Sequence, residues 1–183
     1  MYGLGKPLDN LLLKVERAKK HVLDLEAEYD RFHQTKPYTF SDSTNPQTGE
    51  RTYYVKHAEP IPMEFSVIIG DALNNLRCAL DHLAYHLVCV GVGAIKPFPD
   101  AKFPPGNSLS DYTDQKNRAL HGMRQDAVKA IDALEPYAGG VGEIYFRLSR
   151  LNNFDKHRLL LTAWSRFEAP TLKSLTRPCA PPG

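Results

Sequence analysis

Seven polar side chains fall on one side of a helix expected between residues 63 and 90. At about 100° per residue they lie within roughly 120° of arc, with Arg77 at the edge. A solvated helix face is rich in Lys and Glu, whereas these amides, carboxylates, imidazole and phenol can position partners or move protons. This polar stripe therefore predicts a face turned towards another helix, a partner chain or a ligand. Its members are Asp71, Asn74, Asn75, Cys78, Asp81, His82 and Tyr85.

Arg77 and His82 are five positions apart in this helix. A guanidinium is a fixed cation for a phosphate, and a neutral imidazole can take a proton from a hydroxyl. Together they would suffice for RNA cleavage without a metal. The ribose 2′-hydroxyl would attack the adjacent phosphorus, with His82 as base or acid and Arg77 stabilising the developing charge. In the structural alternative, Arg77 pairs with Asp81 at i,i+4 and His82 is a hydrogen-bonded residue between helices.

A second polar cluster interrupts a helical span expected from residue 142 to about 167. Asp155 and Arg158 continue the apolar stripe of that span, so two charges would point inwards. Burying them is costly unless they are paired, and we expect a network that reaches residues 74–82 of the polar stripe. Lys156, His157 and Arg158 could contact a phosphate, but a purely structural ion-pair role fits equally well. The cluster comprises Asn152, Asn153, Asp155, Lys156, His157 and Arg158.

Other chemistry is less well supported. A metal site from Asp81, His82, His86 and His157 lacks the Glu of a zincin motif and a clear third ligand, so no metal is expected. Cys78 and His82 at i,i+4 could form a nucleophile and base, but a lone thiol is more often a packing residue. Neither Gly91 and Gly93 nor Gly139 and Gly140 form a phosphate loop, so no nucleotide cofactor is expected.

The composition limits the class of protein. The 183 residues, 42% of them hydrophobic, are enough for one domain, and the net charge of +2 gives no field for duplex DNA. No apolar run reaches the roughly 20 residues of a membrane span, and the first residues lack a secretory signal. We therefore expect a cytoplasmic protein. Its three cysteines show no CxxC spacing and predict reduced thiols.

The expected fold is mainly α: one helical domain over residues 1–168 with an inserted β-hairpin, followed by an irregular tail at 169–183. Apolar periodicity predicts helices at 8–32, 63–90, 108–120, 124–134 and 142–167. Short β-favouring runs around a turn-rich segment predict the hairpin at about 36–57, whose aromatic residues could stack bases or pair across strands. Three glycines and four prolines predict a surface loop at 91–107.

Three segments resemble a group of uncharacterised bacterial and phage proteins: GDALNNLR at 70–77, ALDHLAY at 79–85 and LNNFDKHR at 151–158. Over residues 65–90 the helical core in turn resembles the HEPN superfamily, helical bundles with an R-x4-6-H motif. That resemblance implies a metal-independent endoribonuclease or an RNA-binding relative in a bacterial or phage conflict system. It also implies that Arg77 and His82 are catalytic and that the protein is a homodimer. The alternative is a non-catalytic helical protein that binds a small ligand or a protein partner through the polar stripe.

Overall fold

The computed structural model describes residues 5–93 and 99–158. Within them the chain forms helices and one two-stranded antiparallel sheet, so the mainly helical prediction with an inserted hairpin is confirmed. No helix in these two ranges is long and apolar enough to cross a bilayer. The elements in chain order are α1 (Gly5–Gln34), β1 (Tyr38–Thr44), β2 (Arg51–Ala58), α2 (Met63–Val92), α3 (Leu109–Ala119), α4 (Gln125–Asp132) and α5 (Glu143–Arg158).

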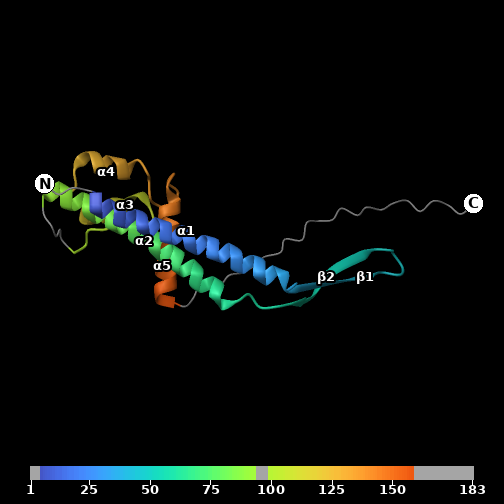
Figure 1. Cartoon of the computed structure of the whole chain (residues 1–183). Helices are drawn as coiled ribbons and strands as arrows, with labels where there is room; N and C mark the ends of the chain where they lie inside the picture. The colour runs from blue at the N-terminus through green and yellow to red at the C-terminus, as the bar shows by residue number, and fades with distance from the viewer. Residues whose placement is uncertain (1–4, 94–98, 159–183) are drawn as a thin grey trace, which may run out of the picture.

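Two 30-residue helices, α1 and α2, lie side by side and antiparallel (Figure 1). The rings of Phe32 and Phe65 meet at one end, with centroids 6.0 Å apart. Leu11 and Ala18 of α1, seven positions and about two turns apart, are both buried. Small residues of α2 at the same spacing, Ala72 and Ala79, are also buried, which lets the two backbones approach closely. This helix pair carries the residues of the polar stripe, whereas the second polar cluster lies on α5.

The β-hairpin continues from the end of the helix pair and points away from it (Figure 1). Phe40 pairs with Val55 and Asp42 with Tyr53, after a register shift between Thr39 and Phe40. Every residue of β2 is exposed. The side chains of β2 therefore add nothing to the buried core, and the hairpin takes no part in the candidate site described below.

The main core lies where the last three turns of α2 meet α3, α4 and the segment that precedes α3. Val88 is fully buried there and Phe103 is 2% exposed. The segment from Leu120 to Met123 passes so close to α2 that a Cβ added at Gly91 would lie 2.2 Å from the carbonyl oxygen of Gly122. This core holds α2 from the side opposite to α1. Its buried members are Ala84, Val88, Ala101, Phe103, Ala119, Leu120, Met123 and Ile131.

The predicted surface loop at 91–107 is irregular over residues 99–107, as expected, but it begins later than predicted and part of it is buried. Helix α2 continues to Val92 and ends at Gly93, which has the left-handed conformation typical of a helix C-terminus. Ala101, Phe103 and Pro104 are then buried, because this segment supplies side chains to the core. Proline and glycine content indicated irregular backbone correctly, but it carries no information about burial.

The later helices differ from their expected bounds by a few residues. Ser108 caps α3, since its Oγ accepts a hydrogen bond from the backbone N–H of Asp111 at 3.2 Å. Helix α4 spans 125–132 rather than 124–134, and α5 begins at Glu143. The expected continuation of α5 to residue 167 and the tail at 169–183 lie outside the described residues.

Candidate functional site

Arg77 is buried between α2, α5 and the segment before α3. Its Nη2 and Nε donate to the two carboxylate oxygens of Asp81, at 2.6 and 3.1 Å. Its Nη1 donates to Ser149 Oγ at 2.5 Å, and Nη2 also donates to the carbonyl oxygen of Phe103 at 2.7 Å. The Asp81 carboxylate in turn accepts from the backbone N–H of Phe103 at 3.1 Å. Four residues from three parts of the chain thus meet around one guanidinium.

This arrangement satisfies the buried guanidinium. The Arg77 side chain is 9% exposed and that of Asp81 is 33% exposed, so the pair sits at the edge of the interior. A bidentate contact to a carboxylate is the favoured geometry for a buried arginine. The i,i+4 pair between Arg77 and Asp81 is the contact expected from the structural alternative. In this structure Arg77 therefore holds α2, α5 and residue 103 together through its hydrogen bonds.

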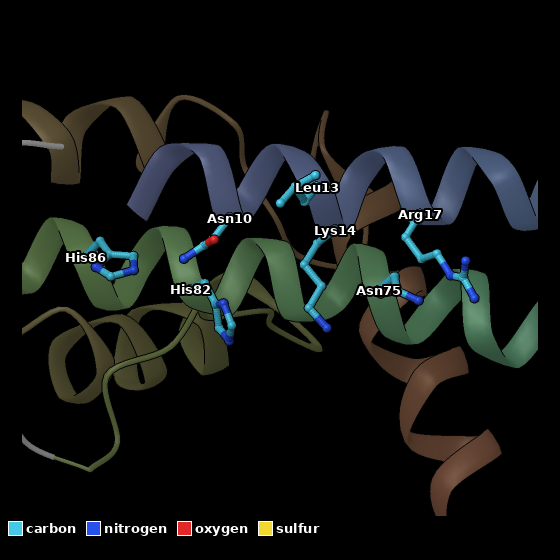
Figure 2. Close-up of a pocket in the computed structure, with 7 residues that line it drawn as sticks. All are labelled: Asn10, Leu13, Lys14, Arg17, Asn75, His82 and His86. Atoms are coloured by element: carbon cyan, nitrogen blue, oxygen red, sulfur yellow. The ribbon is translucent and has the colours of Figure 1, made fainter. Parts of the chain in front are cut away.

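His82 lies in a different environment, since it is exposed and lines an open groove between α1 and α2 (Figure 2). The groove has a volume of about 550 Å³. Arg77 is not among the residues that line it. The Lys14 side chain reaches from α1 across α2 between His82 and Asn75, as Figure 2 shows. We call this the cationic groove; it is lined by Asn10, Leu13, Lys14, Arg17, Asn75, His82 and His86.

The cationic groove contains no carboxylate among its seven lining residues. Lys14 and Arg17 have no ion pair or hydrogen bond with any residue in 5–93 or 99–158. Lys19 on the same helix, by contrast, is paired with Glu16 at 2.7 Å. Lys14 and Arg17 therefore bring two positive charges to a groove whose lining residues include no carboxylate, which favours a bound anion.

The two histidines of the groove affect one another. Partial burial lowers the pKa of His86 below its ordinary value of 6.5, and the neighbouring His82 lowers the pKa further, because two protonated imidazoles would repel. The His86 ring also lies edge-on to Tyr85, with centroids 5.7 Å apart. An anion placed beside His86 would offset this repulsion and favour the charged form of His86.

The rest of the polar stripe does not form a single face. Asn75 Nδ2 donates to the carbonyl oxygen of Asp71 at 2.8 Å, and the Asn74 amide oxygen accepts from Cys78 Sγ at 3.8 Å. Tyr85 packs against the main core, while Asp71 is exposed. The expectation that one neighbour covers the whole stripe is therefore not met, because α1 contacts one part of it and the core the other.

Helix α5 packs on α2 as expected, although the contacts differ from the predicted network. Ser149 rather than Asp155 reaches the Arg77 pair. The Asp155 carboxylate lies against Gly70, one turn before residue 74, so that a Cβ added there would be 2.6 Å from Oδ2. Asn152 is 2% exposed and Asn153 is exposed. Within the described residues, neither Asn152 Oδ1 nor Asp155 Oδ1 has a hydrogen-bond partner. The side chains of Lys156, His157 and Arg158 lie outside the description.

Sequence reasoning did not identify Asn10, Lys14 or Arg17 as site residues, and it considered His86 only for a metal site that it rejected. Lys14 and Arg17 alternate with acidic residues along an amphipathic helix, which is the usual pattern of a solvated face. Their placement beside His82 depends on the rotation of α1 about its own axis against α2. That rotation follows from the packing of both helices and has no local signal in either one.

Comparison with models of known protein families, with curated proteins and with solved structures finds no match. The HEPN resemblance and the pairing of Arg77 with His82 as catalytic residues therefore stay predictions.

Proposed function

We propose that the protein binds single-stranded RNA through phosphate contacts in the cationic groove. The observation that carries this proposal is the pair of cations, Lys14 and Arg17, which have no partner in the described residues and face two histidines across an open groove with no acid. Basic side chains in an exposed groove are the usual means by which proteins follow a nucleic-acid backbone.

The remaining groups in the groove suit RNA. The amides of Asn10 and Asn75 can both donate and accept hydrogen bonds, as recognition of 2′-hydroxyls and base edges requires. The net charge of +2 and the small size of the groove favour a short single strand over a duplex, which presents a much larger phosphate surface.

The proposal assigns different roles to the two residues of the R-x4-H motif. His82 contacts the phosphate, since it is exposed in the groove. Arg77 positions α2 against α5, because its donors are occupied by Asp81, Ser149 and Phe103. Within one protomer an RNA phosphate at His82 would have to displace these contacts to reach Arg77. Binding is thus better supported than cleavage.

Fluorescence polarisation with a labelled 12-nucleotide RNA tests the proposal. Replacing Lys14 and Arg17 together by Gln should weaken binding roughly 10-fold or more. For single strands each lost phosphate contact changes the slope of log K against log salt by about 0.7, so the double variant should lower that slope by about 1.4. Lys19→Gln is the matched control: Lys19 is on the same helix, outside the groove and paired with Glu16. It should leave both quantities unchanged.

Two results would contradict the proposal. One is equal RNA affinity in wild type and the double variant. The other is binding of inorganic phosphate or a mononucleotide with no gain for the oligonucleotide, which would indicate a small-ligand site. The same samples, incubated without divalent metal and run on a gel, address cleavage. Cleavage lost in His82→Ala and retained in Lys19→Gln would restore the nuclease prediction.

A further inference from the structure

The cationic groove is short. In Figure 2 His86 and His82 lie at one end of it, Asn75 and Arg17 lie at the other end, and Lys14 lies between them. On α2 the lining residues run from Asn75 to His86, a distance of about 16 Å at 1.5 Å per residue. A stacked single strand advances about 3.4 Å per nucleotide, so the groove holds no more than about five nucleotides. The residues that follow the groove therefore decide which part of a strand it can hold.

Carboxylates follow the groove on the side of the hairpin. Asp71 is one turn before Asn75 on α2, and the two side chains leave the helix within roughly 40° of each other. Asp24 is seven positions after Arg17 on α1, and these two lie within roughly 20°. Both carboxylates are exposed, and neither has an ion pair with a residue in 5–93 or 99–158. An RNA backbone that ran on towards the hairpin would be repelled there, so the groove suits the end of a strand better than its middle.

The groups in the groove also match the charge of a terminal phosphate. A phosphate within a strand is a diester with one negative charge, whereas a terminal phosphate is a monoester with a charge of about −1.5 to −2 at pH 7 and three free oxygens. Lys14 and Arg17 supply two positive charges about 4.5 Å apart along α1. His82 lies beside Lys14 and adds a ring N–H donor. These three donor groups correspond to the three free oxygens of a monoester, whereas a diester offers two.

We propose that the cationic groove recognises an RNA end that carries a phosphate monoester. The inference rests on the proposed RNA binding and names the part of the strand that the groove holds. Lys14, Arg17 and His82 bind the terminal phosphate. The strand then leaves past His86, which contacts the next phosphate, and so runs away from the carboxylate of Asp71. The same chemistry is present at a 5′-phosphate and at a 3′-phosphate, and the experiment below separates the two.

Competition measured by fluorescence polarisation tests the proposal on the full chain. The probe is a 12-nucleotide RNA labelled at an internal position, and the competitors share one sequence but carry a 5′-phosphate, a 3′-phosphate or two hydroxyl ends. One phosphorylated form should compete at least about 10-fold better than the hydroxyl form, because it adds a charge-assisted contact. The double variant Lys14→Gln and Arg17→Gln should reduce this preference to within about 2-fold. Lys19→Gln should keep it, since Lys19 is paired with Glu16.

Asp71→Asn tests the boundary of the groove. It should raise the affinity for the hydroxyl-ended RNA about 2- to 5-fold, because a strand could then pass through the groove. Asp9→Asn is the matched control, since Asp9 is also exposed and does not line the groove. Equal competition by all three RNAs, with binding still weakened in the double variant, overturns the inference and leaves RNA binding in place. So does an Asp71→Asn variant that behaves like Asp9→Asn. If none of the three RNAs binds, the proposed function fails as well.

Discussion

The role of Arg77 can be tested by removing the partner that neutralises it. In Asp81→Ala the guanidinium of Arg77, with a side chain 9% exposed, keeps its contacts to Ser149 and Phe103 but loses the carboxylate. Breaking a buried ion pair costs about 3–5 kcal/mol. Asp81 is a third exposed, so the lower end applies. The backbone N–H of Phe103 also loses its acceptor, at a cost of about 1 kcal/mol.

Urea unfolding followed by circular dichroism measures this effect. A loss of about 3–4 kcal/mol should move the midpoint by roughly 1.5–2 M at an m-value near 2 kcal/mol/M. His82→Ala should change the free energy of unfolding by less than about 0.5 kcal/mol, because His82 is exposed. An Asp81→Ala midpoint within about 0.3 M of wild type would refute the description of Arg77 as a buried, Asp81-dependent tie.

Two other predictions concern pH and packing. The lowered pKa of His86 makes its protonation unfavourable in the free folded protein, so the protein should lose stability through His86 as pH falls below 6.5. A bound phosphate favours the charged form of His86. RNA affinity, measured by fluorescence polarisation, should therefore rise between pH 8 and pH 5.5 in the wild type and much less in His86→Gln. A flat wild-type profile would contradict this. Gly91→Ala should destabilise the core by about 2 kcal/mol or more, although alanine has a better helix propensity than glycine. The new Cβ would lie 2.2 Å from the carbonyl oxygen of Gly122, which is a backbone atom and cannot rotate away as a side chain can. An unchanged melting temperature would show that the chain there can move aside.

Residue periodicity predicted the elements because each is specified locally. The long helices have apolar residues at three- and four-residue steps, and the hairpin has β-favouring runs on either side of a turn-rich segment. The burial of residues 101–104 could not be predicted this way, since it comes from contacts with α2 and with α3 and α4. The sequence also suggested a surface loop there, because proline-rich irregular backbone is usually exposed.

The candidate site was predictable only in part. A helical wheel gives the angle at which each side chain leaves α2, but it does not show which neighbour occupies that angle. Arg77 and His82 leave α2 five residues apart, and the intervening rotation takes one into the contact with α5 and the other into the groove beside α1. The i,i+4 ion pair of Arg77 with Asp81 was foreseeable from spacing alone, whereas the hydrogen bond of Arg77 to Ser149 was not.

The arrangement of the long helix pair sets a gradient of local stability. Near the hairpin, Figure 1 shows α1 and α2 with no third helix of the described chain beside them, while further along α2 is held by α1, α5 and the main core. Backbone amides at residues 63–68 should therefore open and exchange with solvent deuterium well before those at 80–88, without unfolding of the whole domain. The hairpin end of the molecule can thus respond to a contact through local opening, while the cationic groove, set further along the helix pair, keeps its shape.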